Sequence, residues 1–82
     1  MHYIYILRSE RTGRYYIGST GDVQNRVEEH NAGRTKSTKA FRPWRLIHQE
    51  EYDSQSEARK REMQLKSWKS HSYLESQLNL IA

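Results

Sequence analysis

Residues 1–20, MHYIYILRSERTGRYYIGST, decide the fold because they contain two strand-like segments on either side of a turn. Residues 2–8 and 14–20 are rich in aromatic and β-branched side chains, which favour strands. The short stretch 10–13 between them ends in a glycine and suits a tight connection. The sequence therefore predicts a β-hairpin in this region.

The hairpin brings tyrosines together if its strands pair outward from the ends of the turn. Leu7 then lies opposite Tyr16, and Tyr5 lies opposite Gly18. Tyr5 and Tyr16 become diagonal neighbours on one face of the sheet. Because Gly18 has no side chain, this register predicts a gap where a phosphate could approach. The alternative is a tyrosine-rich amphipathic hairpin that only packs a small core.

The composition predicts one small domain over residues 1–82. A chain of 82 residues has so small a core that each large apolar side chain matters. Cysteine is absent, which excludes disulfides, a thiolate metal site and a cysteine nucleophile. No apolar run has the length of a membrane span, and no signal-peptide pattern is present. We therefore expect a cytoplasmic protein without a membrane partner.

Positive charge is concentrated in one part of the chain. The net charge is +4, but residues 1–48 contain nine Lys/Arg and four Asp/Glu, whereas residues 49–82 contain five and six. One segment has five basic residues and no acidic one: Arg34, Lys36, Lys39, Arg42 and Arg45. Such a segment suits a polyanion, and phosphate contacts supply most non-specific affinity for nucleic acids. A solvated basic surface is the alternative.

A short helix is predicted over about residues 22–31. Asp22 can cap its N-terminus, and a glycine follows its end. Arg26 and His30 are four residues apart, so they share a helix face beside a stripe of two valines. Both polar side chains can therefore reach the edge of the buried surface.

A third strand is expected at residues 44–52, after a polar segment with at most one helical turn near residues 37–41. It should add to the hairpin, because an isolated hairpin is barely stable in water. Simple alternation divides its side chains between two faces. One face carries Trp44, Leu46 and His48, and the other carries Arg45, Ile47 and Gln49.

A long helix is predicted after the capping signature at residues 54–57. Glu62 falls on its inward stripe, four residues after Ala58 and three before Leu65. A carboxylate in that position is costly to bury without a cationic partner or a metal ion. Pairing with Arg26, or a place at the rim of the core, is the structural alternative.

The C-terminal residues predict a last short helix. Ser72 and Glu75 have the spacing of a capping pair. Leu74, Leu78 and Ile81 would then pack back on the body of the domain.

The order of these motifs resembles the GIY-YIG nuclease family, over nearly all 82 residues. The matching positions are Tyr3-Ile4-Tyr5, Tyr16-Ile17-Gly18, Arg26, His30 and Glu62. The segments Pro43-Trp44 and Arg59-Lys60-Arg61-Glu62 are similar to the small stand-alone bacterial members of the family. One departure is that Tyr3 replaces the first glycine of the family pattern.

The resemblance implies an α/β (α+β) fold, with a small, mainly antiparallel three-stranded sheet flanked by helices. It also implies an endonuclease that hydrolyses phosphodiester bonds in DNA with one divalent metal ion, Mg²⁺ or alternatively Mn²⁺. The catalytic residues that it implies are Tyr5, Tyr16, Arg26, His30 and Glu62. Glu62 would hold the metal and Arg26 the phosphate, Tyr5 would act as base or relay, Tyr16 would position water or phosphate, and His30 would pass the proton on.

DNA, or another nucleic acid, is therefore the expected partner of this chain. The residues expected to contact it are Gly18, Arg34, Lys36, Lys39 and Arg42. No recognition module is visible, so a protein partner for targeting is a further possibility. The chain would be a monomer or a weak homodimer. The alternatives to an independent nuclease are a non-catalytic nucleic-acid-binding module and a subunit that cuts only with a partner.

Overall fold

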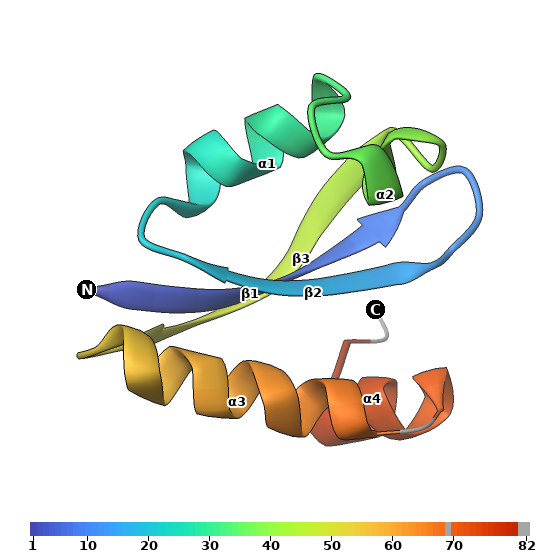
Figure 1. Ribbon diagram of the computed structural model, residues 1–82. Helices are drawn as coiled ribbons and strands as arrows, with labels where there is room; N and C mark the ends of the chain where they lie inside the picture. Colours follow the sequence, from blue (N-terminus) through green and yellow to red (C-terminus); the bar gives the residue numbers. More distant parts are fainter. Residues whose placement is uncertain (69, 81–82) are drawn as a thin grey trace.

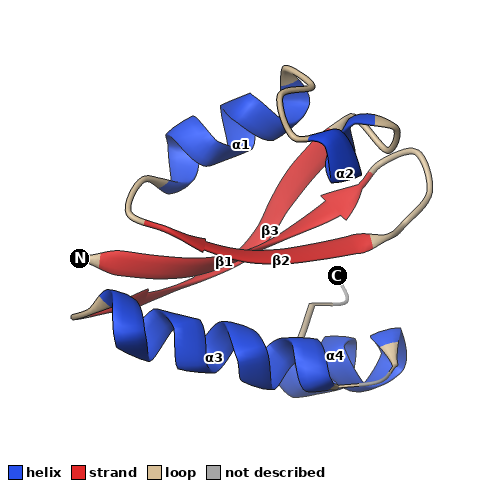
Figure 2. Ribbon diagram, viewed as in Figure 1, coloured by secondary structure: helices blue, strands red, loops and turns tan. Residues whose placement is uncertain are grey.

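The computed structural model describes residues 1–68 and 70–80 as a sheet between two layers of helices. The elements are β1 (His2–Ser9), β2 (Tyr15–Thr20), α1 (Val23–Asn31), α2 (Lys36–Lys39), β3 (Trp44–Tyr52), α3 (Gln55–Ser67) and α4 (His71–Leu78). Helices α1 and α2 lie on one side of the sheet, and α3 and α4 lie on the other (Figure 1). Figure 2 shows the same three layers by element type. The predicted α/β (α+β) class is confirmed.

The sheet has the strand order β2-β1-β3, and both pairs are antiparallel. In the β1–β2 pair, Tyr5 lies opposite Gly18 and Leu7 lies opposite Tyr16. The register predicted for the hairpin is therefore confirmed. Because β1 occupies the centre, β2 and β3 are both edge strands.

The two faces of β1 contribute to two separate cores. On one face Ile4 and Ile6 are fully buried beneath α3, together with Ala58 and Leu65 of that helix. The other face contributes Tyr5 and Leu7 to a cluster under α1. Trp44 is buried in this second cluster, so it is a core residue rather than a surface for stacking bases. Alternation along one strand thus divides the domain into two packed layers.

A β-bulge corrects the predicted faces of β3. Ile6 pairs with His48 while Leu7 pairs with Leu46, so Ile47 is an extra residue in β3. Side chains after the bulge change faces, because the alternation has a period of two. His48 therefore lies on the α3 side, away from Leu46, and Gln49 lies on the α1 side. The simple alternation predicted the opposite for both residues.

The helix ends follow the predicted caps with one exception. Asp22 accepts a hydrogen bond from the backbone of Asn25 at the start of α1. Ser54 caps α3 in the same way. The cap of α4 is Ser70, which accepts from the backbone N–H of Tyr73, so the prediction of Ser72 is wrong. The side chain that meets a free N–H three residues ahead sets the start of the helix.

Helix α4 packs back on the body as predicted. Leu74 is buried in the core under α3, and Leu78 packs against it. Ile81, the third residue predicted for this contact, lies outside the described residues. Among the described residues, no helix combines the length and apolarity needed to cross a bilayer.

Candidate active site

Side chains from both layers meet around the β2 edge of the sheet. They line an open cleft of about 400 Å³, which we call the active cleft. Its lining residues are Tyr5, Tyr16, Gly18, Ser19, Arg26, Arg59, Glu62, Met63 and Lys66. The structure therefore brings together four of the five predicted catalytic residues in one cleft, and the fifth, His30, lies behind the two tyrosines.

Gly18 is required by the Tyr5 side chain. A Cβ atom at Gly18 would lie 2.6 Å from the Tyr5 hydroxyl oxygen and 2.8 Å from its Cζ. The phenol of Tyr5 therefore crosses β2 in the space that a side chain at position 18 would fill. The predicted gap for a phosphate beside Gly18 is occupied by this phenol, which corrects the reason given for the glycine.

The Tyr5 hydroxyl is the outer end of a buried hydrogen-bonded chain. Its oxygen lies 3.0 Å from Nε2 of His30, and Nδ1 of His30 lies 2.9 Å from the Thr38 hydroxyl. The Thr38 hydroxyl donates to the carbonyl of Thr35 at 3.3 Å. Its oxygen is thus left to accept from Nδ1–H, and we assign the proton-free nitrogen to Nε2. The Tyr5 hydroxyl then donates to His30.

Burial sets the protonation states of this pair. It raises the pKa of Tyr5 to about 12, with a further contribution from Tyr16 that the charge of Arg26 partly offsets. Burial also lowers the pKa of His30, and the charge of Arg26 adds to this effect. His30 is fully buried and Thr38 nearly so. A neutral phenol therefore faces a neutral imidazole at pH 7.

Arg26 and Tyr16 enclose the exposed side of this pair. The guanidinium of Arg26 donates to the Glu29 carboxylate at 3.0 Å, and its side chain is 36% exposed. The hydrogen bond to Glu29 raises the pKa of Arg26. The Tyr16 ring lies 6.2 Å from the Tyr5 ring and 4.8 Å from the His30 ring, centre to centre. Arg26 thus presents a fixed positive charge at the mouth of the cleft.

Glu62 reaches the cleft from α3, on the other side of the sheet. Its carboxylate accepts from Lys66 at 2.7 Å, so the alternative pairing with Arg26 does not occur. Burial opposes its ionisation, but Lys66 and Ser19 outweigh that effect and lower the pKa of Glu62. Its side chain is 19% exposed, whereas that of Lys66 is 52% exposed. Glu62 is therefore an ionised carboxylate at the rim of the core.

The residues of the cleft fit a metal ion that takes most of its ligands from elsewhere. In the described part of the chain, no three residues among His, Cys, Asp and Glu form a cluster that could enclose an ion. Glu62 offers one ionised carboxylate. Mg²⁺ is commonly bound by one or two carboxylates, with water and substrate phosphate oxygens as its other ligands. A site with a single protein carboxylate therefore suits a Mg²⁺ ion that is shared with a substrate. It does not suit a structural metal ion, which the protein itself would have to enclose.

Part of the predicted basic segment gathers in a second place. Lys36, Lys39 and Arg42 line an open pocket of about 610 Å³ together with Arg11 from the β1–β2 turn. Arg42 donates to the carbonyl of Lys39, and Arg11 donates to that of Ala40. We call these four cations the basic surface. The predicted Arg34 is exposed but does not line this pocket.

Several residues of the site were not predicted from the sequence. Arg59 and Lys66 stand three residues before and four residues after Glu62, so helical spacing alone could have placed them beside it. Ser19 directly follows Gly18 on the edge strand. The sequence around Thr38 and Arg11 does not indicate that either residue belongs to a site. Each reaches its site only because elements distant in the sequence pack together.

Two tyrosines, an arginine, a histidine and a glutamate around one sheet edge define a class of protein. The model of the GIY-YIG catalytic domain matches residues 1–75 of the chain. The chain belongs to the GIY-YIG family, which is a family of nucleases. The predicted resemblance is thereby confirmed, and nucleic acid is the substrate class of the family.

Within that class, the chain is similar to small UPF0213 proteins. It is 48% identical over 67 residues to one from Halobacterium salinarum, covering 80% of this chain and 86% of that protein. It is 44% identical over 68 residues to one from Staphylococcus aureus, covering 82% of each. The solution NMR structure of a UPF0213 protein from Bacillus halodurans matches with a TM-score of 0.61 at 34% identity, covering 96% of this chain and 83% of that one.

Proposed function

We propose that this chain is a metal-dependent endonuclease that hydrolyses phosphodiester bonds in DNA. The observation that carries the proposal is the composition of the active cleft. A buried phenol–imidazole pair opens into the same cleft as a guanidinium and an ionised carboxylate. A module that only bound nucleic acid would need the cations, but not a buried tyrosine–histidine pair or a carboxylate among them.

The pair supports a proton relay in which Tyr5 passes a proton to His30. A phenol with a pKa of about 12 is not an anion at pH 7 and cannot act alone as the base. Its oxygen can accept the proton of the attacking water while its own proton moves to Nε2 of His30. His30 then becomes an imidazolium, which the Thr38 hydroxyl oxygen stabilises through Nδ1–H. His30 is thus the terminal acceptor, and Tyr5 connects it to the cleft.

Arg26 and Glu62 would act on the phosphate from opposite sides of the sheet edge. The fork of N–H donors on Arg26 matches the oxygens of a phosphate. Glu62 would hold one Mg²⁺ or Mn²⁺, which would neutralise charge on the phosphate and on the leaving oxygen. Lys66 would then leave Glu62 for another anion. Tyr16 would restrict where the water and the phosphate can lie.

The basic surface would bind the nucleic-acid backbone outside the cleft. Contacts of Lys and Arg to phosphates are independent of sequence. Affinity should therefore depend strongly on salt and little on sequence. This supports a structure-guided or partner-guided substrate choice.

The first experiment is a cleavage assay on duplex, single-stranded and branched DNA with Mg²⁺, with Mn²⁺ and with chelator. Wild type would be compared with Glu62→Gln and Arg26→Ala. Glu50→Gln is the matched control, since Glu50 is also a partly buried carboxylate on the α3 side but lies outside the cleft. We expect metal-dependent cutting in wild type and the control, and none in the two cleft variants.

Three results would change the proposal. Cutting that survives Glu62→Gln would contradict the role of the cleft. Salt-dependent binding without cutting under every metal would favour the non-catalytic module. Cutting that appears only after addition of a second protein would favour the partner-dependent subunit.

A further inference from the structure

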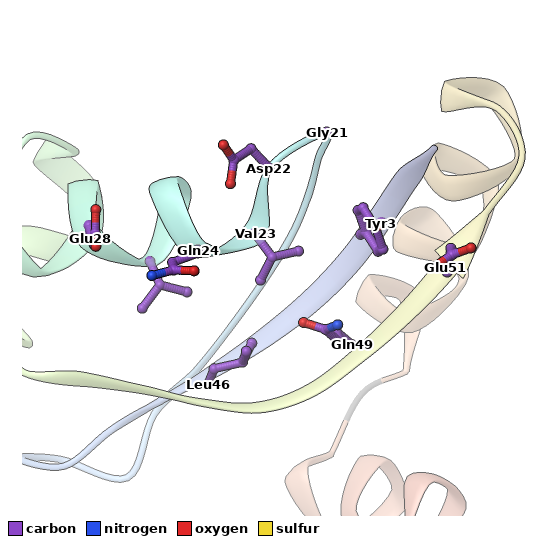
Figure 3. Close-up of a pocket in the computed structure, with 10 residues that line it drawn as sticks. Tyr3, Gly21, Asp22, Val23, Gln24, Glu28, Leu46, Gln49 and Glu51 are labelled. Atoms are coloured by element: carbon purple, nitrogen blue, oxygen red, sulfur yellow. The ribbon is translucent and has the colours of Figure 1, made fainter.

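A second groove lies at the opposite edge of the sheet from the active cleft. It runs between the first turns of α1 and the strand β3, with a volume of about 620 Å³ (Figure 3). Specific ligand sites commonly occupy about 300–1,000 Å³. The lining residues are Tyr3, Gly21, Asp22, Val23, Gln24, Val27, Glu28, Leu46, Gln49 and Glu51. We call this groove the acidic groove.

The floor of the acidic groove is apolar and partly open. Val23 and Val27 reach it from α1, and Tyr3 and Leu46 reach it from the sheet. Leu46 is 37% exposed although it lies within β3, two residues after the buried Trp44. The bulge at Ile47 keeps Leu46 on the α1 side and then brings Gln49 and Glu51 to the same side. The strand therefore presents one apolar and two polar side chains along the groove.

The charge of the acidic groove is opposite to that of the rest of the molecule. Its charged residues are Asp22, Glu28 and Glu51, and the described lining contains no Lys or Arg. The chain as a whole has a net charge of +4. The pocket of the basic surface shows the reverse pattern, since its lining, as far as the structure describes it, has four cations and no acid. A nucleic acid is thus repelled from the acidic groove and attracted elsewhere.

We propose that the acidic groove docks a basic, apolar segment of a protein partner. Lysine or arginine side chains of that segment would face Glu28 and Glu51, and one or two apolar side chains would cover Leu46 and Val27. The charge complementarity commits the occupant to a cationic chain. The position at the β3 edge leaves the active cleft, at the β2 edge, open while the partner is bound.

Two other occupants fit the groove less well. A second copy of this chain would have to supply its basic surface, and such a head-to-tail contact does not close into a symmetric dimer. Regular addition of a strand to β3 is hindered by the bulge at Ile47, because bulges interrupt the ladder of an edge strand. Side-chain contacts, rather than strand pairing, should therefore provide the affinity.

The proposal can be tested by NMR with the full 82-residue chain and a defined peptide probe. The probe is a seven-residue peptide that alternates arginine and leucine. Its controls are one peptide with glutamate in place of arginine and one with serine in place of leucine. We expect saturable shifts of backbone amides confined to the acidic groove, with the basic–apolar peptide binding at least about ten-fold more tightly than either control. Higher salt should weaken the binding.

Charge reversal in the chain provides the matched test. Glu28→Lys with Glu51→Lys should weaken binding of the basic peptide by about ten-fold or more. Glu10→Lys, an exposed charge reversal outside the groove, should leave it unchanged. Circular dichroism checks that each variant is folded. Cleavage of DNA by these variants should equal that of wild type, so the proposal can fail or succeed independently of the nuclease function.

Each contrary outcome would overturn the proposal. Absence of groove shifts at millimolar peptide would do so. Equal binding of the acidic control peptide, or full binding to the double variant, would show that charge is not what the groove selects. Shifts at the groove that depend on protein concentration without peptide would identify a second copy of the chain as its occupant.

Discussion

Glu50 and Glu62 are two carboxylates on the same side of the sheet, and they differ in the side chains that donate hydrogen bonds to them. Their side chains are 22% and 19% exposed, and the pKa of each is lowered. Glu50 accepts from Arg61, His48 and Tyr52, at 2.6 to 3.2 Å. Glu62 accepts from Lys66 at 2.7 Å, and the side chain of that lysine is 52% exposed.

The difference separates a structural carboxylate from one that is available for chemistry. Three donors outweigh the burial of Glu50 and lower its pKa to about 2. They also occupy its oxygens, so no ligand can bind without breaking the set. Lys66 favours the ionised form of Glu62. This lysine can move into solvent at little cost, because exposed ion pairs contribute little to the free energy of unfolding. Glu62 can therefore exchange its lysine partner for a ligand, whereas Glu50 cannot do so without losing three hydrogen-bond partners.

Glu62→Gln should have the largest effect on activity. The change keeps the shape of the side chain and removes its charge. We expect cleavage to fall by about 100-fold or more, the usual cost of removing a group that stabilises charge in the transition state. The free energy of unfolding, measured by urea denaturation, should change by less than about 1 kcal/mol. A large loss of stability instead would make Glu62 a second structural carboxylate.

Glu50→Gln should show the reverse pattern. It leaves Arg61 without its ionic partner at a partly buried site, and we expect a loss of about 2 kcal/mol in urea unfolding. Cleavage per folded molecule should be unchanged.

Acid titration gives an independent readout for Glu50. Its folded pKa of about 2 lies below the ordinary 4.5, so its stabilising contribution is present above about pH 4.5 and lost as the pH falls toward 2. The variant should therefore lose less stability than wild type over this window. An identical acid dependence of both proteins would contradict the hydrogen-bonded set.

The relay should make activity pH-dependent. The pKa of His30 is lowered from 6.5, so His30 is neutral at pH 7 and becomes protonated only on acidification below 6.5. Protonated His30 cannot accept from Tyr5, and cleavage should fall with pH in that range. Thr38→Val, which removes the partner of Nδ1–H, should lower the plateau by about ten-fold. Thr35→Val is the control, since only the Thr35 carbonyl takes part. A plateau in Thr38→Val equal to that of wild type would remove Thr38 from the relay.

Lys66→Met should have the smallest effect on stability. A helical i,i+4 ion pair contributes about 0.5 kcal/mol or less, so urea unfolding should hardly change. The pKa of Glu62, followed by carboxyl carbon NMR, should rise because its main donor is lost. A large loss of stability would show that Lys66 holds Glu62 as firmly as Arg61 holds Glu50, and the comparison would then fail.

Local patterns predicted most of the fold. The register of the hairpin followed from the length of the turn, and Arg26 and His30 followed from helical spacing. The bulge at Ile47 could not be predicted, because an extra residue in a strand depends on how β1 and β3 pack. The same limit applies to Thr38, which meets His30 only after α2 docks against α1. Long-range packing, which leaves no mark in local sequence, accounts for these two differences, whereas the cap of α4 is a local choice between Ser70 and Ser72.

The outer edge of β2, to which no other described strand is paired, has a consequence for how the chain behaves in solution. A bare strand edge is a template on which other chains can add, and charges beside it discourage aggregation. Arg26, Arg59, Glu62 and Lys66 stand around this edge. The side chains proposed to bind and cut nucleic acid would thus also keep the protein dispersed. Replacing all four with alanine should promote assembly into β-rich aggregates as well as abolish cleavage.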